Sequence, residues 1–421
     1  MAVVENRINP WVVAQHAEES AHLRNVRTQL LTAPHIQLPD LGRHDERISA
    51  HLDGVALAGD AGFGYCEQLL ENPGAGEIFA ATVRAIEDGN PQRLGQMLAV
   101  APAATDGWRG LCSALGWVSA THLAGIARSW LASDDPVSRL AGITACALHR
   151  VDPGLIAGRR LEDNDLSVRA RSLRTAGELG KRELVSATAA AIGQEDPDCQ
   201  FWAAYGAVLL GAREASLQFL VALAMKEGPR QLPAFQLALL AMSVTEAHDL
   251  LRQLSGDPAA LRRLIRGAGL AGDPNYIPWL ISRMADDALA RAAGESFSLV
   301  TGLDLAQPDF ERSTPGTPAS GPTDDPEDDN VALDPDDDLP WPEQAKVQAW
   351  WNQNGARFTT GVRHFMGVPP SRAHCIEVLK NGYQRQRIAA AYHLCLLDPG
   401  TPLFEWRAPA WRQQRELAQL T

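Results

Sequence analysis

The residues that could carry out chemistry do not have the spacing that a known reaction requires. Gly267, Gly269 and Gly272 match the G-x-G-x-x-G pattern of dinucleotide-binding loops. Such a loop holds phosphate when it follows a strand, whereas here it follows the run 261–266, which is typical of a helix. We therefore expect a turn between two helices at this point. The sequence also contains no G-x-x-x-x-G-K-[ST] element.

The histidines and acids do not show the pattern of a metal or acid–base site. The eleven histidines include no H-E-x-x-H and have no cysteine partners at metal-ligand spacing. Adjacent acids such as Asp286 and Asp287 point apart on a helix, so capping and solvation explain them better than general acid–base work. A serine–histidine–aspartate set stays open, because triads form between distant positions. We expect no enzyme, no cofactor and no metal.

Arginine and tryptophan are enriched at protein-binding hot spots, and both residue types recur here. Tryptophan and phenylalanine crowd the last 81 residues, where they form either a core or a partner-binding surface. The arginines of the repeat described below either bridge an aspartate of the adjacent hairpin or contact a partner. The candidate partner-binding residues are Arg139, Arg169, Trp202, Trp350, Trp351, Arg363 and Arg385.

A repeated aspartate followed by an apolar helix organises the middle of the chain. Asp135 and Asp165 are 30 positions apart, Asp165 and Asp196 are 31 apart, and Asp257 and Asp287 are 30 apart. Aspartate accepts hydrogen bonds from the first N–H groups of a helix, and the proline that often follows it fits the first helical position. Each copy therefore begins a helix, and a repeat of this length is one helical hairpin.

One hairpin cannot cover its own apolar face, so neighbouring copies must stack and share a core. We therefore predict an all-α protein, an α-solenoid of HEAT-like helical hairpins with a helical N-terminal cap and a helical C-terminal unit. The predicted regions are an N-terminal helical region at 1–132, a repeat array at 133–305, an acidic proline-rich linker or loop at 306–340 and a C-terminal helical unit at 341–421.

The apolar spacing of the N-terminal region predicts several helices. The first two are expected at 9–31 and 47–57, and the glycine-rich stretch 59–64 is expected to form a turn before a helix at 65–70. Further helices are expected at 78–86, 91–99 and 108–118.

The formal net charge of -13 is unevenly distributed. Nine acids lie between Ser313 and Pro340, which leaves about -4 for the rest of the chain. A nearly neutral body without a basic stripe argues against nucleic acid as a ligand. The acidic segment has few apolar residues to offset its ordering entropy, so we expect it to be loosely held. It is either a solubilising tether or a mimic of nucleic acid for a basic toxin.

Two features concern the cellular compartment. No run of about 20 apolar residues is present, and Glu5, Asn6 and Arg7 replace the apolar core of a signal peptide. We therefore expect no membrane association and a cytoplasmic location. The six cysteines are scattered without a C-x-x-C pair, which predicts reduced, buried thiols.

Several short motifs resemble a known family. They are Leu52-Asp53-Gly54, Ala288 to Phe297 with Thr301 to Asp304, Leu339-Pro340-Trp341-Pro342 followed by Trp350-Trp351, Gly361 to Gly367 and Gly382 to Arg387. Together they resemble a family of bacterial HEAT-like-repeat proteins of undefined activity that is encoded in type VI secretion system loci, often near spike and effector genes. That family supplies no catalytic residue to compare.

The resemblance implies a protein that binds a toxin, a spike component or an adaptor. Our expectation is a non-catalytic immunity or effector-handling protein that binds a type VI effector. Two alternatives remain open. One is a secretion-apparatus scaffold or spike adaptor, and the other is a HEAT-like enzyme, such as a lyase or a nucleic-acid-modifying protein.

Overall fold

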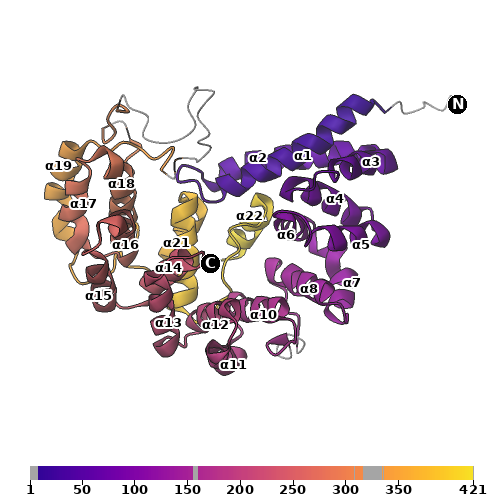
Figure 1. Ribbon diagram of the computed structural model, residues 1–421. Coiled ribbons are helices and arrows are strands. Elements are labelled where there is room, and N and C mark those ends of the chain that lie inside the picture. Colours follow the sequence, from indigo (N-terminus) through magenta and orange to yellow (C-terminus); the bar gives the residue numbers. More distant parts are fainter. Residues whose placement is uncertain (1–7, 155–159, 308, 316–333, 335, 421) are drawn as a thin grey trace. The chain divides into compact units, whose positions relative to one another are not determined.

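The computed structural model describes residues 8–154, 160–307, 309–315, 334 and 336–420 (Figure 1). Within these residues every regular element is a helix, and the only β-type pairings are two isolated bridges. The predicted all-α class is therefore confirmed.

The chain forms two compact units that interleave along the sequence. Unit 1 comprises residues 1–32, 36–211 and 399–421, and unit 2 comprises residues 33–35 and 212–398. The division at 211 falls inside the predicted array at 133–305, and the predicted C-terminal region at 341–421 is shared between the two units.

Unit 1 contains two long antiparallel helices followed by shorter hairpins. Its helices are α1 (Pro10–Leu30), α2 (Leu38–Leu57), α3 (Gly59–Leu69), α4 (Ala75–Glu87), α5 (Pro91–Val100), α6 (Gly107–Trp117), α7 (Ala120–Leu131), α8 (Pro136–Leu148), α10 (Leu166–Glu178), α11 (Val185–Ala190), α12 (Pro197–Leu209) and α22 (Ala410–Gln419), with 3-10 turns η1 (Arg182–Leu184) and η2 (Ala191–Gly193).

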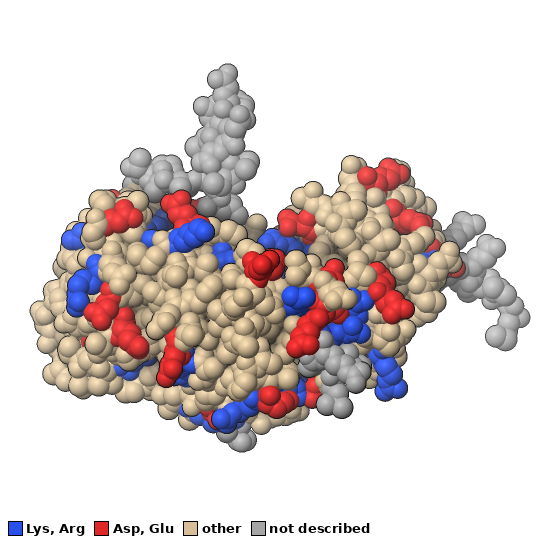
Figure 2. All heavy atoms as spheres, turned by 60° about the horizontal axis from the view of Figure 1, so that its bottom comes forward, with Lys and Arg blue, Asp and Glu red and all other residues tan. Residues whose placement is uncertain are grey.

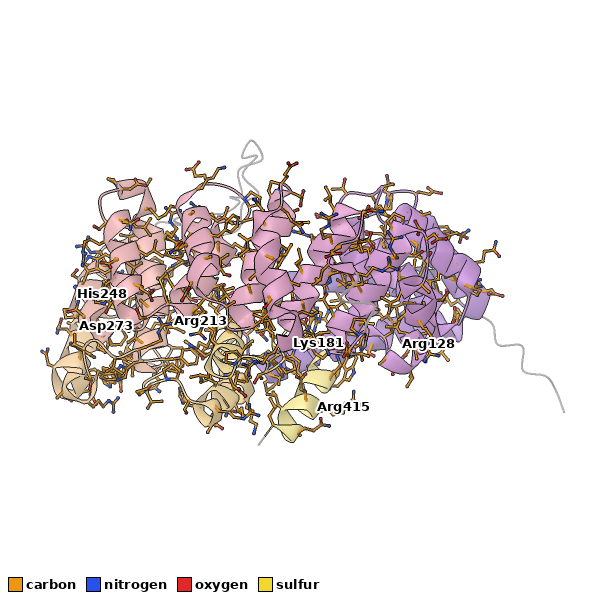
Figure 3. The ribbon with its side chains drawn as sticks, turned by 90° about the horizontal axis from the view of Figure 1, so that it is seen from below. Arg128, Lys181, Arg213, His248, Asp273 and Arg415 are labelled. Atoms are coloured by element: carbon orange, nitrogen blue, oxygen red, sulfur yellow. The ribbon has the colours of Figure 1, made fainter. Side chains whose placement is uncertain are left out.

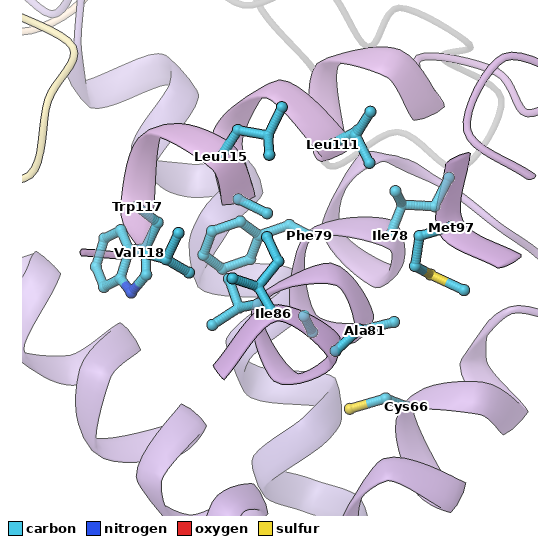
Figure 4. Packing of buried hydrophobic residues seen from close by; sticks show 14 of the residues in the cluster. Cys66, Ile78, Phe79, Ala81, Ile86, Met97, Leu111, Leu115, Trp117 and Val118 are labelled. Carbon is cyan, nitrogen blue, oxygen red and sulfur yellow. The ribbon is translucent and has the colours of Figure 1, made fainter. Parts of the chain in front are cut away.

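The stacking in unit 1 is that of an α-solenoid. Helices α4, α6, α8, α10 and α12 each pack on the next, while α5, α7 and α11 pack beside this row. Figure 4 shows Phe79 at the centre of the first core cluster, with its ring 5.7 Å from that of Trp117 and nearly perpendicular to it. Leu111 and Leu115 of the next helix are fully buried in the same cluster. Each such side chain contributes about 1.5–3 kcal/mol on burial, so the shared core holds successive hairpins together.

The helices α10 and α12 approach closely because glycines face each other where they cross. A Cβ atom added to Gly177 would lie 2.5 Å from the Cα of Gly206. No side chain fits this space, so the two backbones are in direct contact.

Unit 2 is also built of short helices. They are α13 (Glu214–Met225), α14 (Gln231–Ala241), α15 (Val244–Leu254), α16 (Leu261–Ala271), α17 (Ile277–Arg283), α18 (Asp287–Thr301), α19 (Gln344–Asn354), α20 (Arg372–Asn381) and α21 (Gln384–Leu397), with 3-10 turns η3 (Pro258–Ala260), η4 (Pro274–Tyr276) and η5 (Gly355–Arg357).

In unit 2, α14, α16 and α18 stack one on the next in a row, and α15 and α17 pack beside this row. A later loop of the chain caps this row at its carboxyl ends. His364 N donates to the carbonyl of Gly272 at 2.7 Å, and Met366 N donates to that of Leu299 at 2.7 Å. Helix C-termini leave carbonyls without partners, and this loop supplies donors for them.

The aspartate caps predicted from the repeat are confirmed. Asp135, Asp165 and Asp196 each accept a hydrogen bond from a backbone N–H in the first turn of α8, α10 and α12. Asp286 does the same for α18, and Asp257 caps the turn η3 that precedes α16.

Two glycine-rich segments differ from the predictions. Gly59 to Gly64 was expected to be a turn, but it forms the first half of α3. Gly267 and Gly269 lie inside α16, where an added Cβ would meet the ring of Phe235 and the backbone of Ser296 respectively. In α16 the glycines allow close helix packing, and only Gly272, with φ +73°, has the left-handed conformation of a helix end.

Part of the acidic segment is held by arginines. Residues 308, 316–333 and 335 lie outside the described residues, so the expected loose structure is not addressed there. Asp336, however, is only 2% exposed and pairs with Arg262 and with Arg266, the latter at 3.1 Å. Asp334 pairs with Arg291. The end of the segment is therefore bound to unit 2, contrary to the expectation of a loose linker.

We predict that Gly177→Ala lowers the free energy of unfolding by about 1–3 kcal/mol, because the new methyl group forces α10 and α12 apart. Urea unfolding followed by far-UV circular dichroism measures the change.

Gly125→Ala in α7 is the matched control. Its added Cβ meets no atom within 4 Å, so better helix propensity should raise stability by about 0.5–1 kcal/mol. Equal stabilities for the two variants would contradict the close crossing.

Candidate functional site

The C-terminal segment 399–420 lies along the carboxyl ends of the unit 1 helices. Leu403 N donates to the carbonyl of Glu178 at the end of α10 at 2.9 Å. Arg150, just after α8, donates through Nε to the carbonyl of Leu403 at 2.6 Å. Arg412 of α22 donates to the carbonyl of Gly116 in α6 at 2.5 Å. The segment thereby occupies a face that a solenoid could otherwise offer to a partner.

A buried ion pair fixes the same segment to the N-terminal helices. Arg27 of α1 and Asp45 of α2 are paired at 2.5 Å, and the Asp45 side chain is fully buried. Arg27 also donates to the carbonyls of Arg407 and Ala408, at 3.0 and 2.9 Å. Asp45 accepts the N–H of Ala410, which begins α22, at 2.7 Å.

Two buried glutamates form ion pairs with arginines around the same segment. Glu178 of α10 is 1% exposed and Glu405 is 2% exposed. Arg174, Arg171 and Arg407 lie 2.7, 3.4 and 3.6 Å from the Glu178 carboxylate oxygens. Glu405 pairs with Arg407 at 2.8 Å, and it also pairs with Arg150. We call these two acids and four arginines the arginine–glutamate network.

The network sets the protonation of its acids. Burial opposes a charge on Glu178, but Arg174, Arg171 and Arg150 outweigh it and hold the pKa of that carboxyl well below its ordinary value. Arg407 and Arg150 likewise outweigh burial and lower the pKa of Glu405 to about 2, so both carboxylates are ionised at neutral pH. A group with a lowered pKa stabilises the fold above its unfolded pKa of about 4.3, and this contribution is lost as the pH falls toward the folded value.

The one partly exposed cysteine, Cys112, lies near this network. Burial raises its pKa to about 11, even though Arg171 and Arg174 act in the opposite direction. Its thiol is protonated at neutral pH and therefore unreactive. All six cysteines are free, and the other five are buried, as predicted.

Three predicted partner-binding residues lie in unit 1. Arg139 is 9% exposed and donates to both carboxylate oxygens of Asp163, at 3.0 and 2.7 Å. Arg169 donates to the backbone carbonyl of the same Asp163. Trp202 is half-buried, with the guanidinium carbon of Arg174 4.4 Å from its ring centre. Arg139 joins α8 to the start of the next hairpin, whereas Arg169 binds the segment that leads into its own helix α10. Contact of any of the three with a partner stays a prediction.

The other four predicted residues lie in unit 2. Arg363 donates to the carbonyls of Leu239, Leu240 and Met242, which end α14. Arg385 binds both oxygens of Glu295 at 2.9 Å.

Trp350 and Trp351 pack partly buried around Phe297 and Phe358, with Trp350 also 5.3 Å from the guanidinium carbon of Arg357. These side chains have internal partners, and their contact with a binding partner stays a prediction.

One histidine–aspartate pair has the geometry of an acid–base dyad. His248 Nε2 lies 2.9 Å from Asp273 Oδ2, and Figure 3 shows the two side chains together. Asp273 also accepts the N–H groups of Asn275 and Gly361. The aspartate thus connects α15, η4 and the loop at 361. The histidine–aspartate pair therefore has a structural role.

Sequence reasoning missed several exposed or cleft residues. Trp11 is 86% exposed and Leu57 is 82% exposed, although both lie within apolar helical patterns that suggested burial. Arg24 and Arg109 line a cleft in unit 1 that no motif marked.

The described elements define an all-α protein built of stacked helical hairpins. No described helix is long and apolar enough to cross a bilayer, and no group of three metal-ligating side chains occurs among the described residues. No protein-family model, curated protein or solved structure matches the chain.

We predict that Glu178→Gln lowers the free energy of unfolding at pH 7 by about 3–5 kcal/mol, because removing one partner leaves buried arginines uncompensated. The variant should also lose less stability than the parent chain between about pH 4.5 and pH 2.5, since one titrating carboxylate is gone. Urea unfolding at several pH values measures both effects.

Glu183→Gln is the control, because the side chain of Glu183 is 67% exposed and lies 3.8 Å from Lys181. Its stability should change by less than about 0.5 kcal/mol. The network would not govern acid stability if the two variants had the same pH profile.

Proposed function

We propose that this chain is a non-catalytic, cytoplasmic, HEAT-like protein-binding protein that binds a type VI secretion effector, as an immunity or effector-handling protein. The resemblance of its motifs to proteins of type VI secretion loci supports the link to secretion. The stacked hairpins support a role in surface recognition, since such arrays commonly present extended binding surfaces.

The observation that carries this proposal is a set of three exposed apolar side chains at one end of the α1–α2 hairpin. Trp11, Val12 and Leu57 are 86%, 46% and 82% exposed. An added Cβ at Gly54 would touch the ring of His16, so these two positions are level across the antiparallel pair. Trp11 and Val12 lie about one turn before His16, and Leu57 about one turn after Gly54. We call Trp11, Val12 and Leu57 the apolar hairpin end.

The apolar hairpin end has the chemistry of a protein-binding hot spot. The exposed tryptophan and the two exposed aliphatic side chains offer apolar area that water solvates poorly, and exposed apolar area of this kind marks interaction sites. The face in Figure 2 carries acids and bases intermixed, which offers no extended patch of a single charge. The partner is therefore expected to bring an apolar surface rather than a strongly charged one.

We predict that the chain forms a complex with an effector encoded beside its gene and that Trp11→Ala weakens this complex by about 30-fold or more, as loss of a hot-spot side chain does. Co-expression followed by pull-down identifies the effector, and calorimetry with the purified proteins measures the affinity. Because Trp11 is exposed, the variant should keep its fold.

Leu232→Ser is the control, since Leu232 is a 59% exposed apolar residue of α14 in unit 2. Its affinity should match that of the parent chain. Lack of a complex with any neighbouring effector, or equal affinities of the two variants, would contradict the proposal. A toxicity-rescue assay separates immunity from the adaptor alternative, because an adaptor binds a spike component without protecting the cell.

A further inference from the structure

An open cleft of about 680 Å³ lies in unit 1. Three segments line it: the second half of α1, the loop that leads into α4 and the start of α6. Most of the residues that line it are polar or charged, and none of them is aromatic or a large aliphatic residue. The volume is in the range of small-molecule sites.

Arg24 of α1 lines this cleft together with Asp106, whose carboxylate favours the arginine's charge but forms no salt bridge with it. Arg24 is 8% exposed and forms no salt bridge within the described residues. Its guanidinium donates to Ser113 Oγ from Nε and Nη2, to the carbonyl of Arg109 from Nη2 and to Asn25 Oδ1 from Nη1. These four bonds leave one of the two N–H groups of Nη1 without a partner among the described residues.

Holding this charge in the folded state is unfavourable. Burial lowers the pKa of Arg24 from its ordinary value, and the neighbouring Arg109 lowers it further. An anion in the cleft would offset both effects, because it would supply the missing negative charge and accept the unpaired N–H.

A second guanidinium and the uncapped start of α6 line the same cleft. The side chain of Arg109 is 73% exposed and only loosely paired with Asp106, at 3.5 Å. Asp106 precedes α6 with φ 55° and makes no side-chain cap, whereas the start of α4 is already capped by the Glu77 carboxylate, which accepts the N–H of Gly74 at 3.1 Å. The first N–H groups of a helix carry partial positive charge, which adds to that of the arginines.

We propose that this cleft binds the phosphate group of a small, polar phosphorylated molecule. Arg24 and Arg109 contact the phosphate oxygens, which suit the fork of a guanidinium. The cleft is larger than a phosphate ion, and Asn25, Gln29 and Asn72 offer amides to hydroxyl groups on the rest of the molecule. This proposal does not depend on the proposed protein partner.

The test uses inorganic phosphate and ribose 5-phosphate as probes, with sodium acetate and sodium chloride at equal ionic strength. Isothermal titration calorimetry on the full chain should show saturable binding of both phosphate probes, tighter for ribose 5-phosphate. Arg109→Gln should weaken both by about tenfold or more, because a charge-assisted hydrogen bond is lost. Arg109 is exposed, so folding should be unaffected, and circular dichroism checks this.

Arg128→Gln in α7 removes another exposed arginine of unit 1 that does not line the cleft, and it should leave binding unchanged (Figure 3). No saturable binding of either phosphate probe would overturn the proposal, as would equal binding of acetate or unchanged affinity in Arg109→Gln. Equal affinities for ribose 5-phosphate and inorganic phosphate would overturn the assignment of the amides to the remainder of the ligand.

Discussion

The burial of two carboxylates among arginines is the constraint on which unit 1 depends. Glu178 ends α10 and Glu405 belongs to the C-terminal segment, yet Arg150 and Arg407 interact with both. A buried charge that loses its partner is strongly unfavourable, so the folded state must keep the segment in place. The core of stacked hairpins gives unit 1 most of its stability, and the network determines where the end of the chain lies.

This arrangement affects where function can reside. The C-terminal segment already occupies the carboxyl ends of α6 and α10, with Trp411 stacked edge-on against Trp117 at 4.8 Å. Under the proposed function, a partner would meet surfaces that the chain leaves open, such as the exposed Trp11 of α1. In unit 2 the end of a helix is likewise occupied by another part of the chain, because Arg363 caps the carbonyls that end α14.

Local features of the fold were predictable from the sequence, and distant pairings were not. Asp165 and Asp196 mark helix starts because a cap is a contact within three residues of the chain. Asp45 and Ala410, by contrast, are 365 positions apart, and no local pattern reports that they meet. Gly267 was mistaken for part of a turn because glycine serves both turns and close helix contacts, and only the neighbouring Phe235 shows which use applies. The candidate arginines were identified by type, but their internal partners depend on the tertiary fold.

Amide hydrogen exchange of the full chain tests most directly whether the C-terminal segment is an integral part of unit 1. The account predicts that the amides of Leu403 and Ala410, which are bonded to Glu178 and Asp45, exchange as slowly as those in the middle of α10. Exchange of residues 399–420 within seconds, while α10 stays protected, would show a loose tail and contradict the account.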